Sequence, residues 1–345
     1  MRKVRVFLGG YINYTNAQNL NCRAVAEYLD KDKFEVLALT THFGKKEYFE
    51  VNTFNCFKPF SLSTHLGFLW GILNCDVAYL PKHVDTPLWV LQLAKLLKKP
   101  IFTTIEGNVT DLRMSNLISL FGSENKMNNH FSYFTQVFGI TAFLIQKTKS
   151  TISMEDKPLF LGVTGSQFSS RVVNELKSIV FVGGLIKRKR IDEFLELAKL
   201  YSQINFNIIG DGPEKNNLKA MKYSNVVFHG MLPHSEINTI LKYSDLMFLP
   251  AKSEGFPKVI LETAAAGIPS IVYSTYGAID WMKHKENGFI VNDFNEVKGI
   301  VEELLSNTEL LKFTSGNTMK LANDFDWKNI IKDWEKVIVN LYNGR

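Results

Sequence analysis

Residues 253–269, SEGFPKVILETAAAGIP, lie between two short apolar runs and constrain the fold more than any other part of the chain. The run before them, 245–250, and the run after them, 270–273, are short enough to be buried parallel strands. Pro257 suits the first turn of a helix, and Gly267 suits the cap at its C-terminal end. The pattern therefore predicts a strand, a helix and a second strand, which is the βαβ unit of a parallel sheet.

Two glutamates bracket the start of this predicted helix. Glu254 lies just before the helix and Glu262 lies inside it. Backbone N–H groups at a helix N-terminus favour an anion such as a diphosphate, and carboxylates accept hydrogen bonds from sugar or ribose hydroxyls. We therefore predict a nucleotide-sugar site in which Glu254 contacts the sugar and Glu262 the ribose. The expected contacts are Glu254, Gly255, Phe256, Pro257, Lys258, Val259 and Glu262.

The whole string resembles a known family element. Glu-Gly-Phe-Pro, a second Glu after seven intervening residues, a run of small residues and Gly-x-Pro are similar to the E-x7-E element of retaining GT-B glycosyltransferases, most closely glycosyltransferase family 4. Two glutamates at this spacing alone would be unspecific, and an ordinary βαβ corner is the alternative. The resemblance implies two Rossmann-like domains with an interdomain cleft. It also implies transfer of a hexosyl unit, with retention, from a UDP- or GDP-linked sugar to a hydroxyl of a glycan or lipid-linked acceptor.

The length also indicates two domains, because 345 residues exceed one hydrophobic core of ordinary size. Alternating strand and helix patterns place an acceptor-side domain at 1–170 and a nucleotide-sugar-binding domain at 171–327. The final helix, within 328–345, is expected to pack back on the first domain, as is common in GT-B proteins. Strands are expected at 4–8, 34–40, 76–80, 101–105, 178–183, 206–209, 226–228, 245–250 and 270–273.

Composition bears on localisation and partners. No apolar stretch is long enough to span a bilayer, the N-terminus is typical of a first strand, and the three cysteines lack metal-ligand spacing. These features predict a cytoplasmic protein without a structural metal. Residues 1–170 hold 18 Lys and Arg against 13 Asp and Glu, which suits peripheral contact with an anionic membrane as well as an ordinary solvated surface. Nucleic acid is not an expected partner, because no basic stripe with interleaved aromatic residues occurs.

The apolar segment 62–73, which contains Phe68 and Trp70, has two interpretations. It can be a helix packed on the sheet, or it can touch a membrane interface. The sequence favours the first interpretation and leaves the second open.

Two first-domain residues are candidates for the site. Gly9 and Gly10 follow the first strand and are expected to form a turn, and in the family such a loop faces the donor diphosphate. Glu106 follows the strand 101–105, where many family members have a histidine that approaches the donor sugar. Glu106 is expected to hydrogen-bond a donor or acceptor hydroxyl or to act as a base. The alternatives are a plain turn at Gly10 and a structural carboxylate at Glu106.

Basic residues follow the strand 178–183, in the segment GLIKRKR. The family has Val-Gly-Arg-Leu and a nearby Lys here, and both basic residues contact the diphosphate. Lys189 takes the lysine position, whereas Gly184 takes the arginine position, so Arg188 or Arg190 would have to supply the second charge. Basic residues at a helix start oppose the helix dipole, and a bound polyanion would remove that conflict.

The catalytic candidates are therefore Glu254, Lys189 and Glu106, and the departing diphosphate can itself accept the acceptor's proton. No divalent metal or other cofactor is expected, and Asp324-Phe-Asp326 lies at a predicted helix cap. A catalytically silent GT-B subunit that binds a partner transferase is the main alternative, because the expected arginine at 184 and histidine at 106 are absent. A nucleotide-sugar 2-epimerase would need further acid and base residues, which the sequence does not identify.

Overall fold

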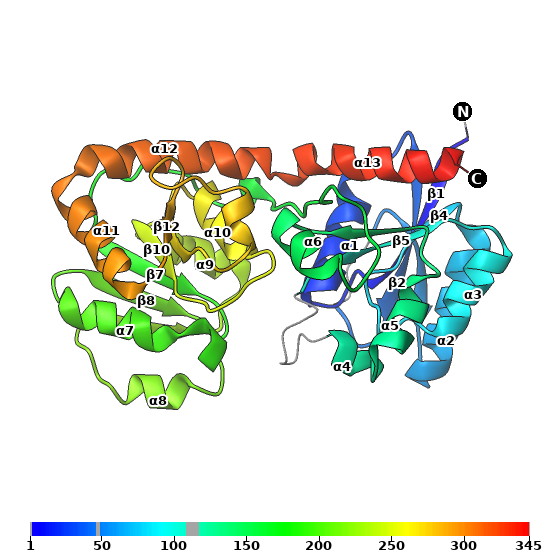
Figure 1. Cartoon of the computed structure of the whole chain (residues 1–345), viewed down its shortest axis with the longest axis horizontal. Coiled ribbons are helices and arrows are strands. Elements are labelled where there is room, and N and C mark those ends of the chain that lie inside the picture. The colour runs from blue at the N-terminus through cyan, green and yellow to red at the C-terminus, as the bar shows by residue number, and fades with distance from the viewer. Residues whose placement is uncertain (1, 46–48, 108–116, 345) are drawn as a thin grey trace. The chain divides into compact units, whose positions relative to one another are not determined.

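The computed structural model describes residues 2–45, 49–107 and 117–344. The chain forms two compact units (Figure 1). Unit 1 comprises Met1–Leu161 and Ile330–Arg345, and unit 2 comprises Gly162–Asn329. The chain passes between the units twice, so the last segment of sequence belongs with the first.

Unit 1 is built on a six-stranded parallel sheet with the order β3-β2-β1-β4-β5-β6. Its strands are β1 Val4–Tyr11, β2 Phe34–Thr41, β3 Asn52–Cys56, β4 Val77–Tyr79, β5 Ile101–Ile105 and β6 Gln136–Gly139. Its helices are α1 Ala17–Tyr28, α2 Phe60–Asn74, α3 Leu88–Leu96, α4 Leu117–Phe121, α5 Glu124–Phe131 and α6 Ala142–Thr148. The strand order reverses direction between β1 and β4, and ligands of open α/β sheets bind outside the carboxyl ends of strands at such a point.

Unit 2 repeats this architecture with the order β12-β11-β10-β7-β8-β9. Its strands are β7 Ser178–Val182, β8 Asn205–Ile209, β9 Val226–Gly230, β10 Leu246–Leu249, β11 Ser270–Tyr273 and β12 Phe289–Val291. Its helices are α7 Ile191–Leu200, α8 Lys215–Lys219, α9 His234–Leu241, α10 Lys258–Ala265, α11 Phe294–Ser306 and α12 Thr308–Asp324, and α13 Trp327–Asn343 follows. Here the order reverses between β7 and β10, so the loops after these two strands are neighbours.

Most expected strands are confirmed within a residue or two, because their side chains are buried on both faces and read as continuous apolar runs. Strand β3 was not expected. It is an edge strand with the sequence NTFNC, and four of its five residues are at least partly exposed, so it lacks the apolar pattern of a central strand.

The turn expected at Gly9 and Gly10 is wrong, because β1 continues to Tyr11. Gly10 lies inside the strand, against α1. A Cβ atom on Gly10 would lie 2.6 Å from Cys22 Sγ, so close packing of the helix on the strand explains this glycine. The diphosphate contact was assigned to Gly10 because a loop was expected there, and the structure has a strand at this position instead.

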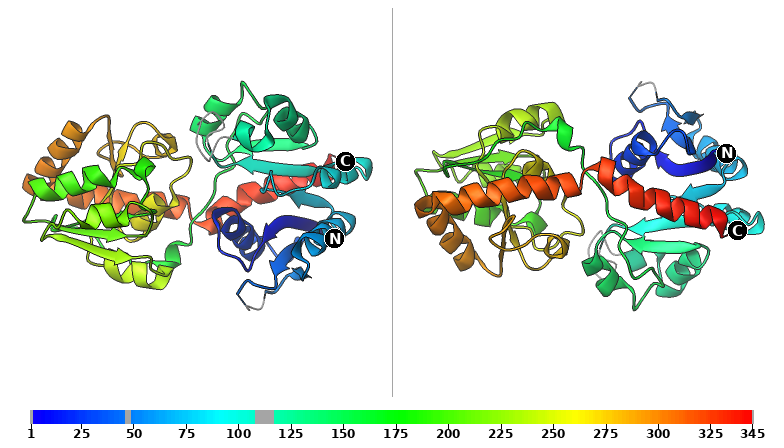
Figure 2. Two further views of the ribbon diagram at one scale, coloured as in Figure 1. Left: turned by 90° about the horizontal axis from the view of Figure 1, so that it is seen from below. Right: turned by 90° about the horizontal axis from the view of Figure 1, so that it is seen from above.

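The boundary between the units also differs from the expected position after residue 170. Residues 162–170 belong to unit 2, because Val163 N–H donates to Phe325 O (2.9 Å) and Gly165 N–H donates to Asp326 Oδ2 (3.1 Å). The final helix is divided. From Ile330 onward it lies with unit 1 (Figure 2), where Trp334 donates to Phe160 O (2.9 Å) and its ring lies 4.9 Å from the ring of Tyr79.

Candidate functional site

The loops after β7 and β10 bring together the basic and acidic residues that the sequence singles out. Lys189 forms an ion pair with Glu254, and Arg188 Nη1 lies 3.0 Å from the same oxygen, Glu254 Oε1. Arg188 also donates to the carbonyl of Ser253, and its own carbonyl accepts from Lys252 N–H (2.8 Å). Adjacent strands at the reversal of the sheet order explain why residues so distant in sequence meet here.

These three side chains are largely removed from water. The exposed fractions are 12% for Lys189, 14% for Glu254 and 27% for Arg188. Two cations share one carboxylate, so the group carries one net positive charge. In a partly buried position such a charge attracts an anion more strongly than on an open surface.

Arg188, and not Arg190, supplies the second positive charge at this place. Arg190 has a left-handed backbone conformation (φ 50°) and caps the start of α7. Its guanidinium pairs with Glu193 and lies 4.6 Å from the centroid of the Tyr273 ring. At Gly184, an added Cβ atom would meet only Asp211 O at 3.9 Å, so packing does not require glycine there.

The start of α10 lies directly after Glu254. Pro257 is the N-cap residue and makes no side-chain cap hydrogen bond, and α10 has no acidic side chain in its first turn. Glu262 is half-buried in the second turn, and Gly267 follows the helix in the left-handed conformation (φ 82°) expected of a C-terminal cap.

Residues Phe256 and Lys258 have structural contacts of their own. The ring of Phe256 packs on Trp281 (5.9 Å between centroids) and Phe325 (6.0 Å), and Lys258 Nζ lies 5.7 Å from the ring of Trp327. These contacts anchor the turn between β10 and α10. The ligand contribution of this turn is therefore expected from its backbone and not from these side chains.

Tyr276 supports the same loop and was not among the sequence candidates. Its hydroxyl donates to Leu249 O (3.0 Å), and Gly277 N–H donates to Glu254 O (3.2 Å). Burial, and then the negative charge of Glu254, raise the pKa of Tyr276 well above its usual value. Nothing in its local sequence distinguishes Tyr276 from an ordinary core tyrosine.

In unit 1, Glu106 lies half-buried at the carboxyl end of β5. Asn21 Nδ2 of α1 donates to Glu106 Oε1 (3.0 Å). The carboxylate thus has a structural partner, and its charge adds to the burial that raises the pKa of Cys22.

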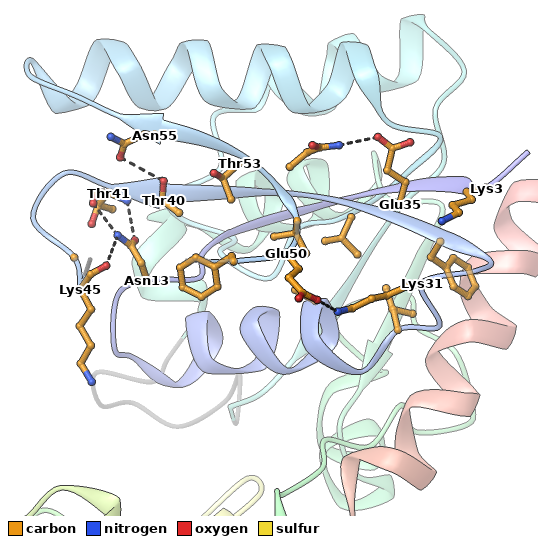
Figure 3. A pocket seen from close by; sticks show the side chains of 18 of the residues that line it. Lys3, Asn13, Lys31, Glu35, Thr40, Thr41, Lys45, Glu50, Thr53 and Asn55 are labelled. Atoms are coloured by element: carbon orange, nitrogen blue, oxygen red, sulfur yellow. Dashed lines mark hydrogen bonds and ion pairs between the residues drawn. The ribbon is translucent and has the colours of Figure 1, made fainter. Parts of the chain in front are cut away.

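Unit 1 also contains a pocket of about 1090 Å³ beside β2 and β3 (Figure 3). At one end Asn13 joins two loops. Its Nδ2 donates to Thr41 O (2.8 Å) and Lys45 O (3.3 Å), and its Oδ1 accepts from Thr41 N–H (2.8 Å). This residue fixes the turn after β2 relative to the end of β1.

Comparison with known proteins shows a family similarity in the second unit. Residues 165–319, all within unit 2, match the family described as glycosyl transferases group 1.

Two curated proteins that are similar to part of this chain are bacterial. An uncharacterised glycosyltransferase of Haemophilus influenzae is 29% identical over 174 residues, which are 48% of this chain and 49% of the relative. The UDP-Gal:alpha-D-GlcNAc-diphosphoundecaprenol alpha-1,3-galactosyltransferase of Escherichia coli is 32% identical over 175 residues, 46% of this chain and 44% of the relative. The match thus spans about half the length of each of these relatives.

The fold of this chain is similar to that of HepE from Anabaena, whose crystal structure in complex with UDP has a TM-score of 0.77. The sequences are 15% identical, and the alignment covers 98% of this chain and 100% of HepE. The expected GT-B fold class, with two parallel α/β sheets, is confirmed.

The structure thus brings Lys189, Arg188 and Glu254 together in unit 2, whereas Gly10 and Glu106 lie in unit 1. The roles assigned to them stay predictions. Among the described residues no group of three or more His, Cys, Asp and Glu side chains is suited to hold a metal ion. In the same part of the chain no helix is long and apolar enough to cross a membrane. Asp326 accepts from Gly165 N–H and Lys328 N–H, as expected of a capping residue.

Proposed function

We propose that this protein is a group 1 glycosyltransferase that moves a hexosyl unit from a nucleoside diphosphate sugar to a hydroxyl of a glycan or lipid-linked acceptor, with retention of configuration. The observation that carries the proposal is the convergence of Lys189 and Arg188 on Glu254 beside the start of α10. The UDP in HepE and the UDP-galactose in the name of the Escherichia coli relative favour a UDP-linked donor.

Each residue of the group has a distinct role in the proposed reaction. The cations of Lys189 and Arg188, with the positive end of the α10 dipole, stabilise the charge that develops on the departing diphosphate. A diphosphate next to these cations competes with Glu254 for them, which releases the Glu254 carboxylate to accept hydrogen bonds from sugar hydroxyls. Glu262, in the second turn of α10, is assigned to the ribose.

Proton transfer in this scheme needs no separate base in unit 2. The diphosphate oxygen that leaves the sugar carries the developing negative charge and lies on the face from which the acceptor hydroxyl attacks. It can therefore take the acceptor's proton while the cations hold it in place.

The test is a screen of nucleoside diphosphate sugars for acceptor-dependent release of free nucleoside diphosphate, with binding measured separately by calorimetry. We expect release with at least one donor, and loss of release in Lys189→Ala. A protein that binds UDP but transfers nothing across a broad set of donors and acceptors would instead be the silent subunit. This second candidate stays open because Gly184 and Glu106 stand where the family resemblance implies an arginine and a histidine.

We also propose that unit 1 attaches peripherally to an anionic membrane through α2 and α3, which are neighbours in the structure (Figure 1). Helix α2 has 15 residues and no charged side chain. Phe68 and Ile72 pack on the sheet, so the sequence interpretation of 62–73 as a sheet-packed helix is confirmed for that face.

The opposite face of α2 is also apolar. Leu62 is 56% exposed and Leu73 is 52% exposed, and on α3 the exposed fraction of Leu96 is 78%. A helix that is apolar on all sides is normally buried on all sides. Exposed lysines border this surface at Lys58, Lys95 and Lys98, which suits anionic headgroups around an apolar contact.

A further inference from the structure

Lys82 is a buried lysine at the carboxyl edge of the unit 1 sheet. It follows β4, where the strand order reverses between β1 and β4, and only 7% of its side chain is exposed. Within the described residues its ammonium has no hydrogen-bond partner, and the nearest carboxylate is that of Asp85 at 3.8 Å. Asp85 is 70% exposed, so it is largely solvated by water and compensates the buried charge only weakly.

The ammonium of Lys82 faces an aromatic ring. Its Nζ lies 4.5 Å from the centroid of the Tyr11 ring at the end of β1. Tyr11 is held by Asn19, which accepts from its backbone N–H (3.0 Å), and by a hydroxyl contact with Thr64 (3.2 Å). Burial lowers the pKa of Lys82, because the charged ammonium loses its hydration and the exposed Asp85 compensates that loss only weakly.

A series of rings continues from Tyr11 to the surface. Tyr11 lies 5.6 Å from Phe60, Phe60 lies 5.1 Å from Phe43, and Phe43 lies 5.5 Å from Tyr14, all measured between ring centroids. Phe43 is 53% exposed and Tyr14 is 45% exposed. We call these four rings the aromatic shelf.

The aromatic shelf is fixed in position before any ligand binds. Phe43 belongs to the turn after β2 that Asn13 holds through Thr41 and Lys45 (Figure 3). A Cβ atom on Gly44 would lie 2.5 Å from the Asn13 side chain, so the turn and Asn13 are in close contact. Exposed aromatic rings in a rigid setting lose little entropy when a ligand packs on them.

We propose that Lys82 and the aromatic shelf form a binding site for the acceptor and that the acceptor carries a phosphate group next to a sugar ring. Lysine binds phosphate as a point charge, and a phosphate would supply hydrogen-bond acceptors to an ammonium whose described partners are only the Tyr11 ring and the Asp85 carboxylate at 3.8 Å. The faces of Phe43 and Tyr14 offer an apolar surface for the C–H face of a sugar. This inference rests on the proposed function and names the chemistry of the acceptor.

The carboxylates of Asp85 and Glu106, near Lys82, bear on which ligands the site prefers. Asp85 is exposed and can turn toward water, whereas Glu106 is held by Asn21. A phosphate with a formal charge between one and two displaces Asp85 more readily than a neutral sugar does. The site should therefore prefer a sugar phosphate to the same sugar without phosphate.

The test compares binding of glucose 1-phosphate and glucose to the whole protein by saturation-transfer NMR, with excess UDP present to fill the donor site. We expect wild-type protein to bind the phosphate form at least about tenfold more tightly, which corresponds to about 1.4 kcal/mol. Lys82→Gln should remove this preference, and Phe43→Ala should weaken both ligands. Lys149→Gln, an exposed lysine of the same unit, should leave the preference unchanged.

Equal binding of the two sugars by wild-type protein would overturn the proposal, as would an unchanged preference in Lys82→Gln. Thermal melting and UDP affinity show whether Lys82→Gln is folded. If Lys82→Gln is unfolded, competition replaces this variant as the test. Inorganic phosphate must then displace glucose 1-phosphate from the wild-type protein and from Lys189→Ala to the same extent. If the protein does not bind UDP but still prefers glucose 1-phosphate to glucose, the proposed donor site is rejected and the proposed acceptor site is retained.

A lipid-linked and a free sugar phosphate share the chemistry of the site. A water-soluble farnesyl diphosphate sugar and glucose 1-phosphate distinguish these two sources when they are offered as acceptors. Product formed from either one, and lost in Lys82→Gln, supports the site. Product formed from both at the wild-type rate in Lys82→Gln contradicts it.

Discussion

Lys189 and Glu254 form an ion pair from two different loops, and Arg188 shares the same carboxylate oxygen at 3.0 Å. The pair exists because β7 and β10 are adjacent at the reversal of the strand order in unit 2. Substitution of Lys189 and of Glu254 should have different consequences, since in the proposed reaction Lys189 attracts the diphosphate and Glu254 competes with it.

Lys189→Ala should weaken binding of UDP by about 1.5–3 kcal/mol, the range for a hydrogen bond to a charged group. Binding of uridine should change much less, because the nucleoside has no diphosphate. Isothermal titration calorimetry of both ligands measures the difference. Lys199→Ala, at an exposed position of α7, is the matched control. Equal losses for UDP and uridine would remove the phosphate role of Lys189.

Glu254→Gln should leave the affinity for UDP unchanged or increase it, because the change frees Lys189 and Arg188 from their carboxylate partner. Turnover should nevertheless fall strongly, because the contact with the sugar is weakened. Calorimetry and an assay of UDP release give the two quantities. If turnover and affinity fell together, Glu254 would be a support of the loop and not a sugar ligand.

Arg188→Ala should reduce turnover, because Arg188 supplies the charge that Gly184 lacks. An arginine at 184 should restore part of it, since an added Cβ there meets only Asp211 O at 3.9 Å. The experiment compares Arg188→Ala with the double variant Arg188→Ala and Gly184→Arg. Arg190→Ala is the control, because Arg190 pairs with Glu193 away from this group. A double variant no more active than Arg188→Ala would contradict the proposed replacement.

Glu106→Gln should lower turnover and leave the melting temperature and UDP affinity nearly unchanged. The glutamine carbonyl can still accept the hydrogen bond from Asn21, so the substitution removes the charge and keeps the structural contact. Calorimetry, thermal melting and the transfer assay are needed together. Full transferase activity in this variant would show that Glu106 only supports α1.

Leu66→Ser combined with Leu73→Ser should reduce binding to vesicles of anionic lipid, because these exposed leucines of α2 belong to the proposed membrane surface. Binding of wild-type protein should also weaken as salt is raised. Co-sedimentation measures both effects, with Leu200→Ser on α7 of unit 2 as the control for loss of an exposed leucine. Dimerisation through α2, seen by analytical ultracentrifugation without vesicle binding, would assign the surface to a second copy of the chain.

Much of the fold follows from local sequence. Short apolar runs define most of the strands, and Pro257 and Gly267 mark the ends of α10 correctly, since these features depend only on burial of both faces and on backbone preference. The string around Glu254 and Glu262 indicates the family by itself.

Only the tertiary structure decided which distant residues meet. The strand order places Arg188 on Glu254, whereas Arg190 in the same basic run pairs locally with Glu193, three residues further along the chain. The tertiary structure also packs Gly10 against Cys22, and it places the Lys82 ammonium over the ring of Tyr11. The physical reason is that such contacts depend on which strands lie side by side, and a sequence pattern of period two or 3.6 contains no information about that order.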